Sequence, residues 1–431
     1  MDGLSQKTHH VVIIGAGFGG LHAAQALGNM PGVRVTVIDK RNFHLFQPLL
    51  YQIATGALSA AEIASPIRFI LNRFQNIQVL LGEVTGIDTQ QQAVTTPEFT
   101  VPYDSLIVAT GSRHHYFGND HWEEMAPGLK TIEDAIAIRH KIFEAFEQAE
   151  RTTDPELQNA WMTFVIVGGG PTGVEMAGAV GELAHYTLKN DFYAIKPGKA
   201  KIYLLEGMDR VLPPYDAISS EKAHDALALL GVTVKTNTLV TEITEDTVTT
   251  KSTQNPEEIE QIAAKTIIWA AGVKASPLGS LLAEKTDAEL DRIGRVVVGK
   301  NMEIPTCPNV YIVGDLANYC HEPVSNGNPL PGVAPVAMQQ GDYVAKVITN
   351  SLKGLPTESF QYHNKGSMAV IGRNAAVAEL GKLRFDGLLA WLAWLFVHVM
   401  HLVEFDNKIL VIIQWFWSYW TKRRGARLIT Q

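Results

Sequence analysis

Gly15-Ala16-Gly17-Phe18-Gly19-Gly20 is the stretch that decides the fold of this chain. An apolar run at residues 10–14 precedes it, and a helical pattern at residues 21–27 follows it. A second apolar run, residues 34–38, ends at Asp39. Strand, G-x-G-x-x-G turn, helix, strand and acid in this order predict a Rossmann-like dinucleotide site. The glycines permit a pyrophosphate to approach the helix N-terminus, and Asp39 is placed to accept hydrogen bonds from a ribose.

The same unit occurs a second time. Residues 163–167 form the apolar run, Gly168-Gly169-Gly170-Pro171-Thr172-Gly173 repeats the fingerprint, and the next run, residues 201–205, ends at Glu206. The polar stretch at residues 185–199 is interpreted as an insertion that lengthens the spacing to this acid. A decayed second copy that binds nothing is the alternative that the sequence leaves open.

A third correspondence supports duplication. Residues 106–109 run into Thr110-Gly111, and residues 267–270 run into Ala271-Gly272, each at about the same distance after its fingerprint. Buried parallel strands have this continuous apolar pattern, and a glycine at the strand end lets the backbone approach a ligand. The sequence therefore predicts two dinucleotides on two Rossmann-like domains.

Length, charge and cysteine content restrict the class of protein further. The 431 residues suffice for two or three domains of roughly 150 residues each. A net charge of −8 argues against a nucleic-acid partner. The two cysteines, Cys307 and Cys320, show no metal spacing and predict neither a disulfide framework nor a metal site. They are also not the closely spaced pair that disulfide reduction needs, and Cys307 is interpreted as a plain buried residue.

Residues 310–315 form an apolar run that ends in Gly314-Asp315, and with this feature the chain resembles the two-dinucleotide flavoproteins. The resemblance implies that the first fingerprint binds FAD, the second binds a nicotinamide nucleotide, and Asp315 contacts the flavin ribityl chain. A simple turn acid is the alternative for Asp315. The FAD residues are then Gly15, Gly17, Phe18, Gly19, Gly20, Asp39, Lys40, Thr110, Gly111 and Asp315. The nicotinamide-nucleotide residues are Gly168, Gly170, Thr172, Gly173, Glu206, Ala271 and Gly272.

Glu206 bears on the choice between NADH and NADPH. A carboxylate at this position suits a free ribose 2′-hydroxyl and repels a 2′-phosphate, whereas an NADP site usually places Arg there. Gly207 and Met208 follow Glu206, and the nearest cation is Arg210. We therefore expect NADH.

Over essentially its whole length the chain resembles the type II NADH:quinone oxidoreductases. The matching segments are residues 42–51, Gly173-Val174-Glu175, residues 334–341 and the apolar tail. The resemblance implies electron transfer from NADH through non-covalent FAD to a membrane quinone, without proton pumping. It places Gln47, Pro48 and Leu49 along the flavin ring.

Two further residues are implicated in catalysis by this resemblance. Glu175 is expected to point toward the flavin–nicotinamide region, although a first-turn glutamate stabilised by the helix dipole is the alternative. Gln339 matches the second Gln of Ala-Gln-x-x-x-Gln, a motif that many relatives carry near the quinone. The first Gln is replaced here by Pro335, which leaves the type of quinone open.

The tail, residues 384–431, differs from the acidic body. It contains six basic and three acidic residues and five of the eight tryptophans. Its apolar stretches, residues 387–403 and 409–420, are short against the roughly 20 residues of a membrane span. They predict two amphipathic helices lying in a membrane interface, with His398 and His401 as interfacial residues rather than metal ligands. A buried helical pair or a dimer interface is the alternative.

The predicted fold class is α/β, with two Rossmann-like domains and a C-terminal helical membrane anchor. Residues 1–125 and 295–375 would form the FAD domain, 126–294 the NADH domain, and 376–431 the anchor. A monotopic protein on the cytoplasmic face of the cell membrane is expected, and a homodimer stays open. The rival functions are a flavoprotein reductase with a naphthoquinone-type or protein acceptor, and an NADH-sensing regulatory flavoprotein.

Overall fold

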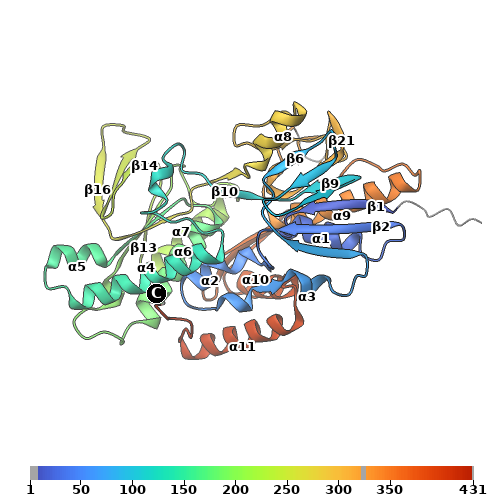
Figure 1. Cartoon of the computed structure of the whole chain (residues 1–431). Helices are drawn as coiled ribbons and strands as arrows, with labels where there is room; N and C mark the ends of the chain where they lie inside the picture. The colour runs from blue at the N-terminus through green and yellow to red at the C-terminus, as the bar shows by residue number, and fades with distance from the viewer. Residues whose placement is uncertain (1–7, 322–326, 430–431) are drawn as a thin grey trace, which may run out of the picture. The chain divides into compact units, whose positions relative to one another are not determined.

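The computed structural model describes residues 8–321 and 327–429 of the chain (Figure 1). They divide into two compact units, each built from three segments. Unit 1 contains Met1–Leu45, Ala64–Arg113 and Val273–Asn364, and unit 2 contains Phe46–Ile63, His114–Gly272 and Lys365–Gln431. These units are defined by packing and cut across the segments expected from the sequence, so the functional domain boundaries stay a prediction.

Unit 1 is built on a six-stranded sheet with the order β20-β21-β9-β1-β2-β5. All neighbours are parallel except β20 and β21. The central strands are buried along most of their length, which explains their continuous apolar sequences. The strand bounds are β1 His9–Ile14, β2 Val33–Asp39, β5 Ile77–Leu81, β9 Ser105–Val108, β20 Glu303–Ile304 and β21 Cys307–Ile312.

Two helices of unit 1, α1 (Phe18–Ala26) and α9 (Ala334–Leu352), pack against each other (Figure 1). Gly341 makes this possible, because a Cβ there would lie 2.2 Å from the backbone oxygen of Gly19. The other elements are β3 Phe43–Leu45, β4 Ala64–Pro66, α3 Ile67–Leu71, β6 Gly86–Asp88, β7 Ala93–Thr95, β8 Thr100–Pro102, β10 Ser112–His114, β18 Val273–Ala275, α8 Leu278–Thr286, β19 Val296–Val297, η6 Gly314–Leu316 and β22 Ala317–Asn318.

Unit 2 repeats the plan with a four-stranded parallel sheet, β13-β12-β11-β17. This order corresponds to β5-β2-β1-β9 of unit 1, so the predicted duplication is visible in the strand order. The strands are β11 Thr163–Val167, β12 Lys201–Leu205, β13 Val232–Lys235 and β17 Thr266–Trp269. Around them lie α4 Ile132–Arg151, α5 Pro155–Trp161, α6 Pro171–Glu182, α7 Ala217–Leu229, β14 Thr238–Ile243, β15 Thr247–Ser252 and β16 Ile259–Ala263.

Besides the sheet β14-β15-β16, unit 2 has another three-stranded sheet, which follows α9 in the sequence. Strands β23 (Ser367–Gly372), β24 (Ala375–Leu380) and β25 (Leu383–Asp386) are antiparallel, and α6, α7 and α10 pack on them. Gly178 lets α6 approach β23, since a Cβ at this position would lie 1.8 Å from the backbone oxygen of Ile371. This packing places the helix that follows the second glycine loop beside the C-terminal region. The short elements η1 Gln47–Leu49 and α2 Leu50–Ala54 also belong to this unit.

The chain ends in two helices, α10 (Gly387–His401) and α11 (Phe405–Thr421). Large apolar side chains on both are solvent-exposed, among them Leu389, Phe396, Phe416 and Trp420. Within the described residues, no helix combines the length and apolarity that a membrane span requires. The predicted α/β class with Rossmann-like sheets is confirmed, and the two C-terminal helices are present.

Candidate functional site

The first glycine loop of unit 1 connects β1 to α1. Gly15 has φ +93°, and a Cβ on it would lie 2.6 Å from the backbone oxygen of Ala109. A Cβ on Gly20 would lie 1.8 Å from the backbone oxygen of Gly15, so both positions require glycine. A Cβ on Gly17, by contrast, would meet no atom within 4 Å. Gly17 therefore keeps space open at the N-terminus of α1, where an anionic phosphate is stabilised.

Asp39 at the end of β2 is tied to this loop. Its Oδ2 accepts a hydrogen bond from the Ala16 N–H at 2.6 Å, and its Oδ1 accepts one from the Arg41 N–H at 2.8 Å. Burial raises the pKa of this carboxyl, and the two N–H donors oppose that shift. The Nδ1–H of His44 donates to the Ala16 oxygen at 2.8 Å, which fixes the same loop from the other side. His44 is a residue that sequence reasoning missed.

Further polar groups of unit 1 lie in the chain segments that follow the carboxyl ends of β9 and β21. Ser112 Oγ donates to Asp315 Oδ2 at 2.5 Å, and the Gly314 N–H donates to Oε1 of buried Gln340 at 2.7 Å. Thr110 Oγ1 is buried and has no hydrogen-bond partner among the described residues. A buried hydroxyl of this kind normally has a partner. The Thr110 hydroxyl, the open space at Gly17 and the anchored acids Asp39 and Asp315 fit FAD.

The second glycine loop, in unit 2, has the same geometry. Gly168 has φ +107°, and a Cβ on it would lie 2.6 Å from the backbone carbon of Ala270. A Cβ on Gly173 would lie 1.8 Å from the Gly168 oxygen, and a Cβ on Gly170 would meet no atom within 4 Å. These values match Gly15, Gly20 and Gly17 closely. The second copy has therefore kept the loop geometry of the first.

Glu206 holds the second loop as Asp39 holds the first. Its Oε2 accepts from the Gly169 N–H at 2.6 Å, and its Oε1 accepts from the Met208 N–H at 2.8 Å. Arg210, the nearest cation in the sequence, donates instead to the backbone oxygens of Pro213 and Tyr215. The residues present fit a nucleotide with a free 2′-hydroxyl, because the carboxylate at the strand end has no arginine bonded to it in the described structure.

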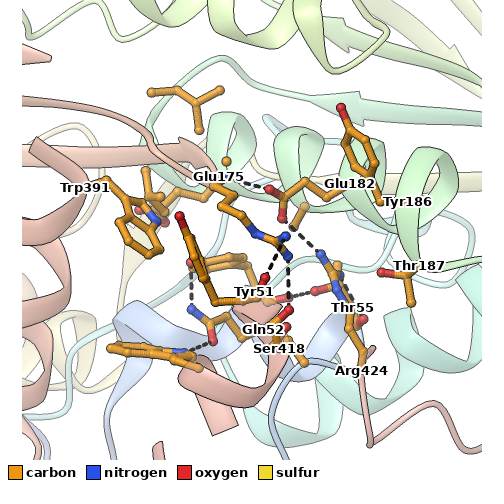
Figure 2. A pocket seen from close by; sticks show the side chains of 18 of the residues that line it. Tyr51, Gln52, Thr55, Glu175, Glu182, Tyr186, Thr187, Trp391, Ser418 and Arg424 are labelled. Atoms are coloured by element: carbon orange, nitrogen blue, oxygen red, sulfur yellow. Dashed lines mark hydrogen bonds and ion pairs between the residues drawn. The ribbon is translucent and has the colours of Figure 1, made fainter. Parts of the chain in front are cut away.

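A cavity of about 110 Å³ in unit 2 contains the predicted catalytic Glu175 (Figure 2). Glu175 comes from the second turn of α6, and burial raises its pKa to about 8, opposed by the Val370 N–H. Tyr51, Gln52 and Trp415 form a hydrogen-bonded chain in the wall: Trp415 Nε1–H donates to Gln52 Oε1 at 2.7 Å, and Gln52 Nε2–H donates to the Tyr51 hydroxyl at 2.9 Å. A pKa of about 8 keeps the half-buried Glu175 carboxyl mostly protonated at neutral pH, in a cavity lined by aromatic side chains.

Two arginines and a glutamate line another part of this cavity (Figure 2). Buried Arg424 donates to the Thr55 oxygen at 3.0 Å and to Glu182 Oε2 at 3.4 Å. Arg373 donates to the backbone oxygens of Tyr419 and Ser418, in the last turn of α11. Cations at a helix C-terminus are favourable, so these contacts hold α11 and the chain after it against the core of unit 2.

The other residues that the sequence implicated in flavin or quinone contact are not among those that line this cavity. Gln47, Pro48 and Leu49 form η1 of unit 2, with Leu49 buried and Gln47 exposed. Lys40 is exposed and lies 3.5 Å from Glu83.

Gln339 belongs to unit 1 and bonds with both ends of its amide to the backbone of His363, at 3.1 and 2.9 Å. Pro335 lies in the first turn of α9. The roles of these residues stay predictions.

Sequence reasoning missed several residues that the structure brings to these sites. His44 and Tyr51 were within reach, because both lie in the segment after Asp39 that carries the family resemblance. Only folding brings the other missed residues next to their partners; these residues are Ser112, Gln340, Trp394 and Arg424. Cys307 is half-buried rather than fully buried as expected, and the partial burial raises the pKa of its thiol, which disfavours the reactive thiolate.

Two family models match successive parts of the chain. Residues 9–341 match the pyridine nucleotide-disulphide oxidoreductase model, and residues 364–424 match the NDH2 C-terminal domain model. The first covers both glycine loops and Asp315. The second covers β23–β25 and both C-terminal helices.

Relatives match over nearly the full length. The type II NADH:quinone oxidoreductases Ndh and NdhA of Mycobacterium tuberculosis are each 45% identical to this chain, over 98% of it and over 91% and 89% of their own lengths. The solved structure of NDH2 from Plasmodium falciparum in complex with NADH has a TM-score of 0.86 at 21% identity, covering 98% of this chain and 100% of that one. At this identity the solved structure shows likeness of fold.

Proposed function

The chain belongs to the family of type II NADH:quinone oxidoreductases, flavoenzymes that pass electrons from NADH to a quinone, and we propose how its residues divide that work. The predicted family, enzyme class and cofactors FAD and NADH are confirmed. The observation that carries the proposal is the matched pair of loops, in which Asp39 and Glu206 each accept two backbone N–H groups at the same positions.

In unit 1, the loop from Gly15 to Gly20 would hold the FAD pyrophosphate, Asp39 the adenosine ribose, and Asp315 the ribityl chain. Bound FAD supplies a carrier that accepts a hydride from NADH and passes electrons on to a quinone. Thr110 Oγ1, buried without a described partner, is an available donor or acceptor for the same ligand. Ser112 and Gln340 act indirectly, because they position Asp315 and Gly314.

In unit 2, the loop from Gly168 to Gly173 would hold NADH. Glu206 would accept hydrogen bonds from the free ribose hydroxyls while its carboxylate also keeps the loop in place. A 2′-phosphate would meet this negative charge without a compensating arginine, so NADPH is disfavoured.

Glu175 would serve as the proton donor when a quinone is reduced. Its raised pKa keeps the carboxyl protonated at neutral pH, and the cavity around it is lined by aromatic side chains. A general acid is most effective when its pKa lies near the working pH. The alternative, a helix-dipole role for the carboxylate, fits poorly with a carboxyl that is mostly neutral at pH 7.

The exposed apolar faces of α10 and α11 would attach the protein to a membrane surface as a peripheral, monotopic protein on the cytoplasmic side. Leu389, Phe396, Phe416 and Trp420 are each at least 66% exposed, and exposed Lys422 and Arg423 follow α11. An apolar helix face next to cations is typical of interfacial binding. Burial of this face in a homodimer is the competing arrangement.

Acceptor screening of the holoenzyme in detergent tests the function against its rivals. With NADH as donor, short-chain ubiquinone and menaquinone analogues are expected to turn over faster than ferredoxin-type proteins. Preference for a protein acceptor would support a reductase of another class. Slow turnover with all acceptors, together with a change in molecular size on adding NADH, would support a regulatory flavoprotein.

A further inference from the structure

The indole of Trp394 is a buried hydrogen-bond donor that the fold leaves without an acceptor. Trp394 lies on α10, is 1% exposed and lines the cavity that contains Glu175. Its Nε1 is shielded from solvent and has no hydrogen-bond partner among the described residues. Buried indole N–H groups usually find a partner, so this one indicates an acceptor that is not part of the chain.

The orientation of this ring is fixed by its neighbours. His398, one turn further along α10, stacks on it with ring centroids 4.1 Å apart, and the His398 Nδ1–H donates to the Trp394 backbone oxygen at 2.7 Å. The rings of Trp415 and Tyr51 lie 5.5 and 6.5 Å away. A side chain packed on several sides in this way cannot rotate to find a partner elsewhere without disturbing the core.

The other polar groups of the cavity wall narrow the chemistry of the missing acceptor. Trp415 already donates its Nε1–H to Gln52, and Gln52 donates in turn to the Tyr51 hydroxyl. The protonated Glu175 carboxyl is a second donor in the same cavity. A cavity with aromatic walls and two available donors, Trp394 and Glu175, suits a flat ring that carries acceptor oxygens.

The volume of the cavity agrees with a flat ring as its ligand. About 110 Å³ is of the order of the roughly 150 Å³ cavity that holds a benzene ring in another protein. One ring of a planar head group is therefore the part that this space would take, while the rest of the molecule stays outside it.

We propose that the Nε1–H of Trp394 donates a hydrogen bond to a carbonyl oxygen of the quinone ring bound in this cavity. The inference rests on the proposed quinone reductase function and adds the residue that orients the acceptor. His398 then acts as a positioning residue, because it holds the indole plane by stacking.

The first test measures binding to the oxidised holoenzyme in detergent. Dimethyl-naphthoquinone is compared with dimethylnaphthalene, a ring of similar size that lacks carbonyl oxygens. Trp394→Phe is expected to weaken quinone binding about tenfold, the value of one hydrogen bond, and hydrocarbon binding by less than about twofold. Trp391→Phe, which removes an indole from the same cavity, should change both affinities by a similar factor.

Equal weakening of both ligands by Trp394→Phe, or no weakening of the quinone, would overturn the proposal. If the wild-type enzyme binds no quinone at all, the proposed function itself fails, which is a distinguishable result.

A second measurement needs no variant. The infrared C=O bands of ¹³C-labelled quinone bound to the wild-type holoenzyme are expected to include one carbonyl band lowered relative to the free quinone. Two unshifted bands would contradict the proposal even if Trp394→Phe does not fold.

Discussion

Asp39 and Glu206 show how a single carboxylate serves both structure and ligand choice. Each accepts two backbone N–H groups, one from its glycine loop and one from the residue two positions further on. Each was found from the sequence alone, because an acid at the end of the strand after G-x-G-x-x-G has a defined position in the fold. Their backbone contacts were not foreseen, since these depend on loop conformation.

Glu206→Gln tests the nucleotide choice. Loss of the negative charge removes the repulsion of a 2′-phosphate, so the ratio of kcat/KM for NADPH to that for NADH is expected to rise about tenfold or more. The KM for NADH should rise as well, because the amide nitrogen cannot accept from the loop. Asp209→Asn removes the same charge from an exposed neighbour and is the matched control. An unchanged ratio in Glu206→Gln would contradict the assignment.

Glu175→Gln tests the proton donor. The pKa of Glu175 is raised from 4.5 to about 8 in the folded protein, so folding takes up a proton between these pH values. The folded state consequently loses stability as the pH rises from about 4.5 to about 8, by up to about 5 kcal/mol. Glu175→Gln should abolish this pH dependence, whereas Glu221→Gln, on the exposed face of α7, should keep it. Chemical denaturation at a series of pH values measures the effect.

The same variant has a kinetic consequence. Gln cannot donate a proton, so quinone turnover is expected to fall about 10²-fold. In the wild type, quinone turnover should decline above about pH 8, where Glu175 loses its proton. Full turnover by Glu175→Gln would leave this carboxyl only a structural role.

At the scale of single residues, the sequence could not predict contacts between side chains that lie far apart along the chain. Ser112 meets Asp315, and Gln340 meets Gly314, because β9, β21 and α9 come together in the fold. Trp394 lines the same cavity as Glu175, although the two residues are far apart in the sequence. No local pattern encodes such pairings, and Trp394 looked like any other tryptophan of the tail.

At the scale of elements, each glycine loop contains two kinds of glycine. One kind is required by close packing of the backbone, and the other leaves space for a ligand. Gly173→Ala would place a Cβ 1.8 Å from the Gly168 oxygen, so unit 2 should be destabilised by about 2 kcal/mol or more. Gly170→Ala meets no protein atom within 4 Å and should unfold at the wild-type temperature. It should nevertheless raise the KM for NADH, because the methyl group enters the phosphate space. Thermal unfolding and steady-state kinetics distinguish the two; similar behaviour of both variants would contradict this division.

The helices α10 and α11 carry the prediction of membrane attachment. Replacing exposed Phe416 and Trp420 together by Ser should weaken binding to anionic lipid vesicles by at least about tenfold, because both side chains would leave the apolar interface. Leu229→Ser, on a similarly exposed apolar residue of α7, is the control. Unchanged flotation with vesicles and loss of a dimer in light scattering would show instead that this face joins two copies.

Elements were predicted well where the pattern is local. Both β–α–β units and the two tail helices follow from runs of apolar residues and from glycine positions, and α10 and α11 begin and end near the predicted limits. The antiparallel sheet β23–β25 was not predicted, although α6, α7 and α10 all pack on it. Its strands pair with their neighbours in the sequence, but α6 and α7, which pack on them, lie far away along the chain, so no local pattern marks this packing.

At the scale of the whole molecule, the two units share the same parallel sheet order and differ in the elements added to that sheet. Unit 1 adds β21 and the Asp315 turn to its sheet, and unit 2 adds the sheet β23-β24-β25, the cavity and the two C-terminal helices. In unit 2, the helix that follows the nucleotide loop, α6, also supplies Glu175 and Glu182 to the cavity. One helix thus links the predicted NADH site to the predicted acceptor site.

The most direct test of the central claim is an anaerobic experiment with the purified holoenzyme in detergent. NADH is added first, the flavin absorbance band is followed, and a short-chain quinone is added next. Bleaching by NADH and prompt recovery of the band on addition of quinone are the predicted results. Bleaching without recovery would contradict the quinone as acceptor, and bleaching with NADPH but not with NADH would contradict the role of Glu206.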